Sequence, residues 1–354
     1  MRTDKAREPS LLSFQSVLIG VTSVAFFLSL SGCDRERDGG EREVVLYSSV
    51  DEPVARPILE EFTKRTGVRV ALQTDTEANK SAGLVARLEA EKANPKADVW
   101  WGNEVFRTIN LADNGVLAAY ESPAAKDVPA MFKDPSHLWA GCGQRARVIA
   151  VHSDRAERRV NPLPNYSIED LARPELKGRV AIADPRAGTT SGHVAALYVL
   201  WGDTKAEKFF RALRANEIKV LGGNGDVATE VAKGTVLAGL TDNDDVANAA
   251  AERGKIDAAL PDQKPGQAGT LTIPCTVALV AGAKHPDDAK KLIDYLLSAE
   301  VEKRLIDSKF ARYSVRPGGG DTIKSMDVDY RAVAKVLARA ANSAEAILVG
   351  RDGG

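Results

Sequence analysis

From residue 44 onward, short apolar runs alternate with longer segments in which apolar residues recur every three or four positions. Short runs of this kind predict strands, and the longer periodic segments predict helices. The predicted strands cover residues 44–47, 68–72, 97–101, 179–183, 218–221 and 236–240. The predicted helices cover residues 51–65, 84–88, 104–114, 191–202 and 205–215. This alternation is typical of an α/β fold, in which helices cover both faces of a mainly parallel sheet.

Two further apolar, β-branched runs, residues 147–151 and 276–280, flank the middle block of the chain. A domain inserted between two such strands gives a two-lobed molecule with a hinge. The length of 354 residues also favours more than one core. We therefore expect residues 44–146 and 275–315 to form lobe 1 and residues 147–274 to form lobe 2. A C-terminal helical segment, residues 316–354, would follow them.

The chain starts with a long apolar stretch, residues 11–30, which three basic residues precede. Such a segment is typical of an export signal. It ends in Leu30-Ser31-Gly32-Cys33, which resembles the bacterial lipobox, where small residues precede the cysteine that receives the lipid. We expect residues 1–33 to be a lipoprotein signal peptide, Cys33 to be lipidated and residues 34–43 to be a flexible tether. The alternative is an uncleaved transmembrane anchor, since about 20 residues can span a bilayer.

Charge and cysteine content narrow the class of protein further. The 48 Lys and Arg residues nearly balance the 49 Asp and Glu residues, for a formal net charge of -1. This balance implies no basic surface for nucleic acid. Cys142 and Cys275 would lie in an oxidising compartment after export, where they either form a disulfide or remain two buried free thiols.

Several segments together resemble the bacterial periplasmic solute-binding proteins, and most of all their ferric-ion-binding branch. They are residues 45–49, 62–70, 97–101, 111–117, 176–180, 183–185 and 289–296. The resemblance implies a two-lobed periplasmic-binding-protein fold of type II, with two parallel or mixed sheets, helices on both faces and a two-strand hinge. It also implies a ligand cleft between the lobes, a monomer, and an ABC permease in the inner membrane as the partner.

The first candidate for ligand binding is the segment Tyr47-Ser48-Ser49 with Asp51, between the first strand and the first helix. Free N–H groups at a helix N-terminus, together with small hydroxyl groups, suit an anion or a polar head group. In the ferric branch a metal-ligating His occupies the position that Asp51 matches, so the resemblance implies a metal ligand there. The alternative is a helix cap alone.

A second candidate follows the strand that ends in Trp101. The ferric branch has a carboxylate metal ligand here, which falls on Asn103 by position, with Glu104 one residue later. We take Glu104 as the candidate ligand. The alternative is an Asn cap followed by a favourable first-turn Glu. Trp100 and Trp101 precede this site, and we expect one to lie in the core and the other to floor the cleft.

The segment Thr241-Asp242-Asn243-Asp244-Asp245 is the most informative. It follows a predicted strand and opens a helix, so we expect it at the cleft edge. In the ferric branch two adjacent tyrosines supply phenolate ligands at the positions of Asp244 and Asp245. Adjacent carboxylates remain hard oxygen ligands that suit a hard cation, and Asp242 would contact the ligand beside them. An acidic helix cap would explain one or two of these residues.

The anion side of the ligand could be held by Thr189, Thr190 and Ser191, which precede a predicted helix, and by Asn224 in a weaker segment of the same kind. The alternative is a capping loop. Arg147, like Arg145, lies at the first crossover and could reach into the cleft or form an interdomain salt bridge. The four histidines show no metal spacing, and only His193 could approach the cleft.

These residues predict a binding protein with no chemistry of its own, anchored in the periplasm or at the cell surface. The expected cargo is a metal ion such as Fe³⁺, with or without an anion, and no cofactor is expected besides it. The alternatives are a phosphorylated, phosphonate or cationic organic solute. An exported metal-dependent hydrolase is a different class, but the sequence contains no nucleophile elbow and no HExxH motif.

Overall fold

The computed structural model describes residues 42–75, 82–153, 163, 166–318 and 323–350. The predicted signal peptide, Cys33 and nearly all of the predicted tether lie outside these residues. The described residues form one compact unit. Among the described helices, none has both the length and the apolar character needed to cross a bilayer.

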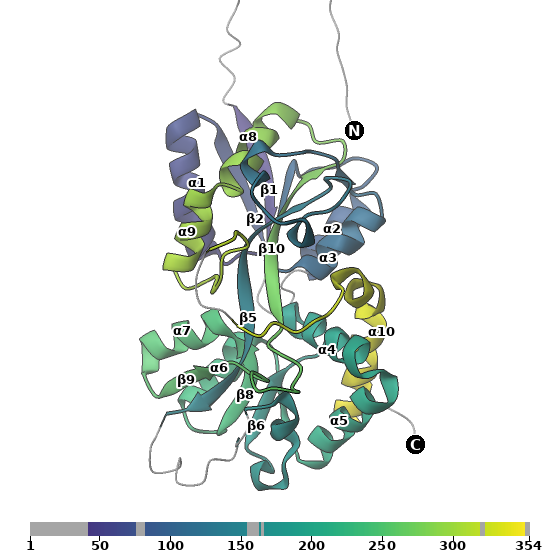
Figure 1. Cartoon of the computed structure of the whole chain (residues 1–354). Helices are drawn as coiled ribbons and strands as arrows, with labels where there is room; N and C mark the ends of the chain where they lie inside the picture. Colours follow the sequence, from purple (N-terminus) through teal and green to yellow (C-terminus); the bar gives the residue numbers. More distant parts are fainter. Residues whose placement is uncertain (1–41, 76–81, 154–162, 164–165, 319–322, 351–354) are drawn as a thin grey trace, which may run out of the picture. The chain divides into compact units, whose positions relative to one another are not determined.

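The strands lie side by side in the order β2-β1-β3-β10-β5-β8-β6-β7, and β4 pairs with β10 while β9 pairs with β5 (Figure 1). We call the first part sheet A, which contains β1 (Glu43–Ser48), β2 (Arg69–Thr74), β3 (Val99–Gly102), β4 (Leu117–Ala118) and β10 (Thr272–Val280). Sheet B contains β6 (Val180–Ala183), β7 (Lys219–Leu221), β8 (Ala238–Asp242) and β9 (Ile256–Ala259).

The strand β5 (Ala140–His152) belongs to both sheets. Its first half pairs with β10 up to Ala146, and its second half pairs with β8 from Arg147 onward. In sheet A, β1 pairs in parallel with β2 and β3, and in sheet B, β6 pairs in parallel with β7 and β8. The predicted strands 147–151 and 276–280 are present within β5 and β10, and both are longer than the sequence pattern indicated, because β5 starts at Ala140 and β10 at Thr272.

Helices cover both faces of both sheets, as the alternation predicted. On sheet A, one face carries α1 (Glu52–Thr66), α8 (Pro286–Leu296) and α9 (Ala299–Asp307), and the other carries α2 (Ala82–Ala90) and α3 (Val105–Asp113). On sheet B, α6 (Asn224–Ala232) and α7 (Asn243–Arg253) cover one face, and α4 (Gly188–Trp201) and α5 (Asp203–Ala215) cover the other. Short 3₁₀ helices are η2 (Pro123–Ala125), η3 (Ala130–Phe132), η5 (Ile168–Ala172) and η6 (Pro174–Leu176).

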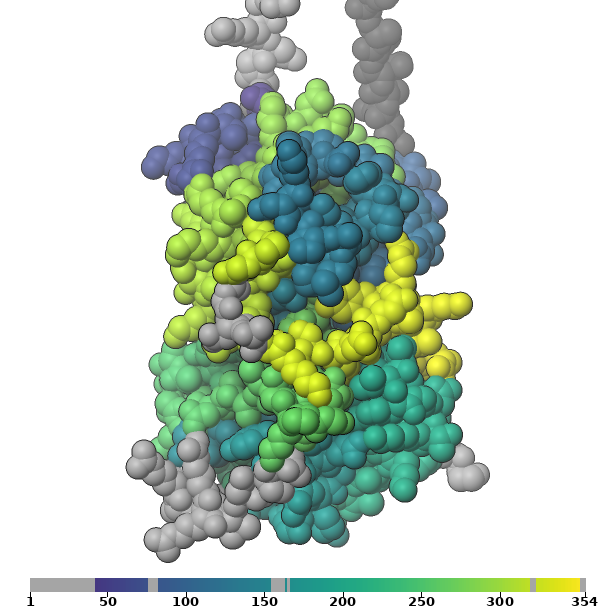
Figure 2. Space-filling model, viewed as in Figure 1, coloured from purple at the N-terminus to yellow at the C-terminus, as the bar shows by residue number. Residues whose placement is uncertain are grey.

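The last helix, α10 (Tyr330–Val349), packs against α3 beside sheet A and against α4 and α5 beside sheet B. In the space-filling view, these C-terminal residues, in yellow, lie across the boundary between the blue and the teal residues (Figure 2). Arg331 near the start of α10 pairs with Asp113 at 3.1 Å, and Arg339 pairs with Asp203 at 2.8 Å. The helix therefore contacts both parts of the molecule.

Trp100 and Trp101 are both completely buried, so the prediction that one of them floors the cleft is wrong. Successive residues of a strand point to opposite faces, and both faces of β3 are covered by helices. Trp100 packs under α3 and donates from Nε1 to the hydroxyl of Thr108 at 2.8 Å, whereas Trp101 packs in the core beneath α1 and α8.

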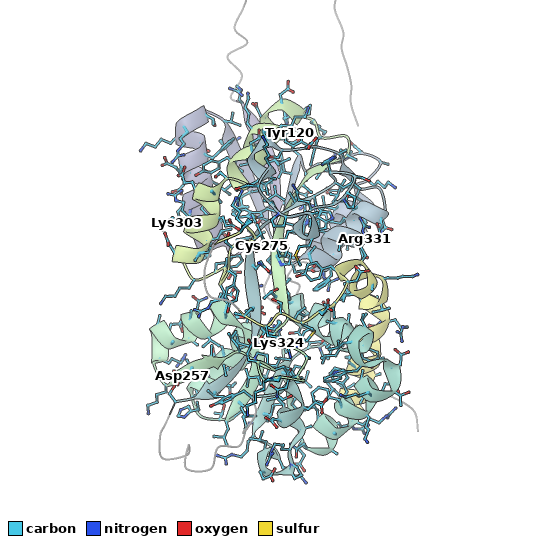
Figure 3. The ribbon with its side chains drawn as sticks, viewed as in Figure 1. Tyr120, Asp257, Cys275, Lys303, Lys324 and Arg331 are labelled. Carbon is cyan, nitrogen blue, oxygen red and sulfur yellow. The ribbon has the colours of Figure 1, made fainter. Side chains whose placement is uncertain are left out.

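Cys142 and Cys275 are free and completely buried on the neighbouring strands β5 and β10. Figure 3 labels Cys275 among the side chains around β10. Of the two alternatives that the sequence left open, the structure contains the free thiols. Burial raises the pKa of the Cys275 thiol to about 12, which keeps it protonated.

Glu302 in α9 anchors the start of β5. Its carboxylate accepts hydrogen bonds from the backbone N–H groups of Gly143 and Val315 at 2.8 and 2.7 Å, and it pairs with Arg316 at 2.7 Å. Gly143 has a φ of 67°, a left-handed conformation that glycine adopts without strain. A buried carboxylate thus holds an irregular point of the strand that both sheets share.

We expect Glu302→Ala to lower the free energy of unfolding by about 3 to 5 kcal/mol, because it leaves buried donors and Arg316 without their acceptor. Urea unfolding followed by circular dichroism measures this loss. The control is Glu300→Ala on the same helix, where the removed carboxylate is exposed and pairs with Arg65. Equal effects of the two substitutions would contradict a structural role for the buried carboxylate.

Candidate functional site

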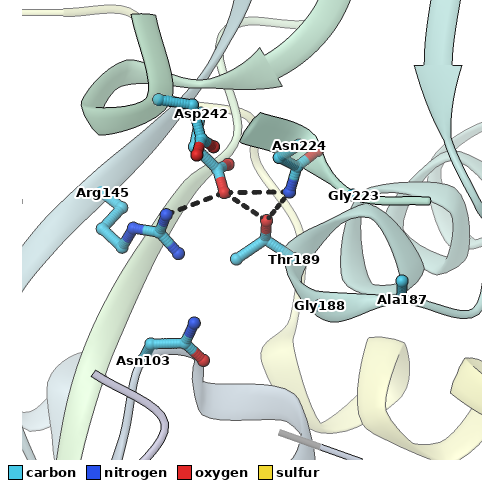
Figure 4. Close-up of a pocket in the computed structure, with 9 residues that line it drawn as sticks. Asn103, Arg145, Ala187, Gly188, Thr189, Gly223, Asn224 and Asp242 are labelled. Carbon is cyan, nitrogen blue, oxygen red and sulfur yellow. Dashed lines mark hydrogen bonds and ion pairs between the residues drawn. The ribbon is translucent and has the colours of Figure 1, made fainter. Parts of the chain in front are cut away.

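A polar pocket with an empty volume of about 300 Å³ lies where β3, β5 and β8 meet the N-terminal ends of three helices (Figure 4). Residues beside sheet A and residues beside sheet B both line it. Asn103 follows β3 and Arg145 lies in the middle of β5. The remaining lining residues follow strands of sheet B, and they are Ala187, Gly188, Thr189, Gly223, Asn224, Asp242 and Asp245.

The helices around the pocket are α4, α6 and α7, which begin at Gly188, Asn224 and Asn243. The first N–H groups of a helix have no partner inside the helix, and they carry partial positive charge. This wall of the pocket therefore suits a negatively charged group. Gly188 has a φ of 46° at the start of α4, which a residue with a side chain rarely adopts.

The predicted acidic cluster forms at the end of β8. One oxygen atom from each of Asp242, Asp244 and Asp245 lies within 4.8 Å of the others. Asp242 and Asp244 are buried, and Asp245 is partly exposed. Carboxylate oxygens at this spacing are the ligands that a hard cation prefers.

Two guanidinium groups compensate the buried carboxylates. Arg145 donates from Nη2 to both oxygens of Asp244 at 2.7 and 2.6 Å, and it pairs with Asp242 at 2.9 Å. Arg147 pairs with the other oxygen of Asp242 at 2.7 Å. Burial raises the pKa of Asp242, but Arg145 and Arg147 outweigh it and lower this pKa to about 2. Asp242 is therefore charged at neutral pH.

Asp244 is compensated less completely. Burial and the negative charges of Asp242 and Asp51 together raise its pKa to about 6, against the attraction of Arg145. The two neighbouring carboxylates thus differ in environment: Asp242 pairs with two guanidinium groups and Asp244 with one.

Arg147 is completely buried behind the pocket wall and does not line the pocket. Its Nη1 also donates to Thr189 and Asn224 at 3.0 and 3.1 Å, and its Nη2 donates to Thr190 at 3.3 Å. Of these predicted ligand residues, Thr189 and Asn224 reach the pocket surface. Ser191 is buried, and its hydroxyl donates to the carbonyl of Gly188 within the first turn of α4.

His193 lies next to this buried network, since its Nδ1 is 3.4 Å from Nε of Arg147. Burial lowers the pKa of His193 to about 3, and the positive charge of Arg147 lowers it further, so the imidazole is neutral. It does not line the pocket. The expected approach of His193 to the cleft is therefore not observed.

Asn103 lines the pocket, whereas Glu104 does not. Glu104 is the N-cap of α3, and its buried carboxylate accepts from the backbone N–H groups of Phe106 and Arg107 at 2.6 and 3.1 Å. Burial raises the pKa of Glu104, although Arg107 and these hydrogen bonds oppose the shift. The side chain of Asn103 is fixed by Ser49, whose hydroxyl donates to its Oδ1 at 3.0 Å.

The other predicted residues near β1 lie in different surroundings. The hydroxyl of Ser48 donates to the carbonyl of Trp101. Ser48, Ser49 and Asp51 line a second, more open pocket with an empty volume of about 690 Å³. Tyr47 is completely buried on the α2 side, where its hydroxyl donates to Glu91 at 3.0 Å, so its side chain does not line either pocket.

The sequence pattern did not single out Gly223 as a lining residue. The available signal was a glycine between the predicted strand 218–221 and Asn224, a place where a helix N-terminus can follow a strand. Both Arg145 and Arg147 were candidates to reach the cleft from the sequence. In the structure Arg145 lines the pocket and Arg147 lies behind it.

A model of the bacterial extracellular solute-binding protein family matches residues 44–310. The chain belongs to this family. Iron uptake protein A1 of Synechocystis sp. is 26% identical over 323 residues, which cover 86% of each chain. The Fe(3+)-binding periplasmic protein of Serratia marcescens is 25% identical over 87% of this chain and 89% of its own. A solved Bordetella ferric binding protein has a TM-score of 0.69 and 26% identity, over 88% of this chain and all of its own.

The predicted type II periplasmic-binding-protein fold is thereby confirmed. Members of this family bind solutes, and the polar pocket at the carboxyl ends of β3 and β8 is where a sheet of this kind binds a ligand. The chemistry of the lining combines carboxylates, a guanidinium group and helix N-termini, so it can hold cationic and anionic groups.

We expect Glu104→Ala to lower the free energy of unfolding by about 1 to 2 kcal/mol, because the first turn of α3 loses its cap. Thermal and urea unfolding both report this loss. Glu121→Ala is the control, since its side chain is exposed. If the two variants were equally stable, the capping role of the Glu104 carboxylate would be wrong.

Proposed function

We propose that this solute-binding protein is the exported component of an ABC importer and that its cargo is Fe³⁺. The observation that carries the proposal is the carboxylate cluster of Asp242, Asp244 and Asp245 in a member of this family. Relatives named for iron uptake and for Fe(3+) binding match more than four fifths of this chain. Three carboxylates close together supply the oxygen ligands that a small, highly charged cation requires.

The metal ligands in this proposal are Asp244 and Asp245, with Asp51 from the opposite side of the cleft. The negative charge of Asp51 acts on both Asp244 and Arg145, which supports their proximity. Glu104 is no longer proposed, because its carboxylate caps α3. Thr189, Asn224 and Asp242 line the pocket and would contact the cargo or an accompanying anion.

Capture would follow from the way in which β5, paired with β10 in sheet A, continues into sheet B. We propose residues 44–146 and 275–315 as lobe 1 and residues 147–274 as lobe 2, with the hinge in these two strands. Closure of the lobes around the cargo would bury it, and the closed form would dock on the permease. The protein would act as a monomer and catalyse no reaction.

We expect the double substitution Asp244→Asn and Asp245→Asn to weaken Fe³⁺ binding by at least about 100-fold, because two charged oxygen ligands become neutral amides. Competition of the protein with nitrilotriacetate for Fe³⁺ measures the affinity. The control is Asp257→Asn, an exposed carboxylate at β9 that Figure 3 labels far from β10. An unchanged affinity would remove the pair from the site.

Native mass spectrometry of the purified full-length chain, before and after unfolding, tests the cargo itself. A released mass of one iron atom supports the proposal. A released organic molecule that contains phosphorus, with no iron, would contradict it and assign the helix N-termini around the pocket to a phosphate group.

Lipid anchoring is a separate proposal, and Cys33→Ser tests it. We expect the unchanged chain and a Cys275→Ser control to incorporate labelled palmitate and to partition into the detergent phase of a Triton X-114 extract. Cys33→Ser should lose the label, because the thioether to the lipid cannot form. The label and not the partitioning is the readout for this variant, since a chain without the lipid keeps the apolar residues 11–30. An unchanged chain that enters the detergent phase without the label would indicate the uncleaved transmembrane anchor instead.

A further inference from the structure

The acidic cluster already contains a cation, because the guanidinium group of Arg145 lies between its carboxylates. Nη2 of Arg145 is 2.6 Å from Asp244 and 2.9 Å from Asp242. The side chain is only 3% exposed. Its guanidinium carbon lies 5.0 Å from the ring centre of Phe310, so an aromatic face supports it from another side.

The position of Arg145 in the pocket distinguishes it from Arg147. Arg145 lines the pocket and can be reached by a cargo, whereas Arg147 is completely buried behind Thr189 and Asn224. If Arg145 moved, Asp242 would keep Arg147 at 2.7 Å and stay compensated. Asp244 pairs only with Arg145 among the ion pairs of the described residues. An exchange of cations would therefore take place at Asp244.

A cluster of carboxylates without an internal cation would bind Ca²⁺ and other divalent ions, which prefer oxygen ligands. A cargo ion that enters this cluster must instead replace a charge-assisted, two-pronged pair in a buried site. The attraction of an ion to a carboxylate at a given distance grows in proportion to the charge of the ion. A trivalent ion therefore replaces the guanidinium group more easily than a divalent ion does.

We propose that Arg145 is a selectivity-determining residue that occupies the acidic cluster as an internal counter-cation and excludes divalent cations from it. This inference rests on the proposed capture of Fe³⁺ by the same cluster. Unlike the proposed function, it predicts that removal of one positive charge widens the range of cations that bind. A residue with a structural role alone would not change the choice between ions.

The test compares the full-length chain with Arg145→Met, which keeps an unbranched apolar stem and removes the charged guanidinium group. Calorimetry with Ca²⁺ and Mn²⁺, and competition with nitrilotriacetate for Fe³⁺, measure the affinities. We expect Arg145→Met to bind the divalent ions at least about tenfold more tightly than the unchanged chain. Arg253→Met is the matched control, because Arg253 is exposed in the last turn of α7.

Arg145→Lys serves as the second variant and decides the question if Arg145→Met does not fold. Lysine keeps the charge but cannot form the two-pronged pair with Asp244, so its divalent affinity should be intermediate. Adding Asp244→Asn to Arg145→Met should abolish the gained binding, because the exchanged carboxylate is lost.

Divalent affinities of Arg145→Met and Arg145→Lys that equal those of the unchanged chain would overturn the inference. Loss of Fe³⁺ binding in both folded variants would also overturn it, because Arg145 would then contact the cargo directly. If the unchanged chain does not bind Fe³⁺ while Arg145→Met still gains divalent binding, the proposed cargo is wrong and the role of Arg145 stands.

Discussion

The structure depends on the compensation of buried charge where β5 meets β8. Arg147 and Asp242 are direct partners in the register of these strands, and their side chains pair at 2.7 Å with both groups buried. An uncompensated charge at this depth would cost several kcal/mol, so the pair strongly favours this one alignment of β5 on sheet B. Because β5 also pairs with β10, the same contact fixes sheet B relative to the strand that continues into sheet A.

The same network positions the groups that a solute would meet. Arg147 donates hydrogen bonds to the side-chain oxygens of Thr189 and Asn224 from the buried side of the pocket wall. Both residues also line the pocket. Arg145, two residues earlier on β5, points into the pocket and pairs with Asp244. Residues two apart in a strand lie on the same face, so the two arginines differ in depth and not in face: Arg145 lines the pocket, and Arg147 is buried behind it. Binding and stability thus share residues here: Asp242 lines the pocket but also pairs with the buried Arg147, whereas Asp244 pairs with Arg145.

Local periodicity predicted most of the elements, because strands and helices each have a fixed spacing of buried positions. The segment 241–245 was also correctly predicted to follow a strand and to open a helix. The partners of these carboxylates could not be predicted, since Arg145 and Asp244 are 99 residues apart in the chain. The burial of both tryptophans likewise depends on the helices that cover β3, which its own sequence does not specify.

The contacts between the two sheets' helices constrain how the pocket can open. Arg107 of α3 donates to the carbonyl of Arg186 and to Ser191 at the start of α4, at 3.0 and 3.3 Å. Gly192 lies so close to the ring of Phe106 that an added Cβ would lie 2.3 Å from it. Opening by a hinge in β5 and β10 would have to separate these surfaces, and α10 packs on α3 and α4 alike. In such an opening, α10 would have to follow one sheet or slide on the other.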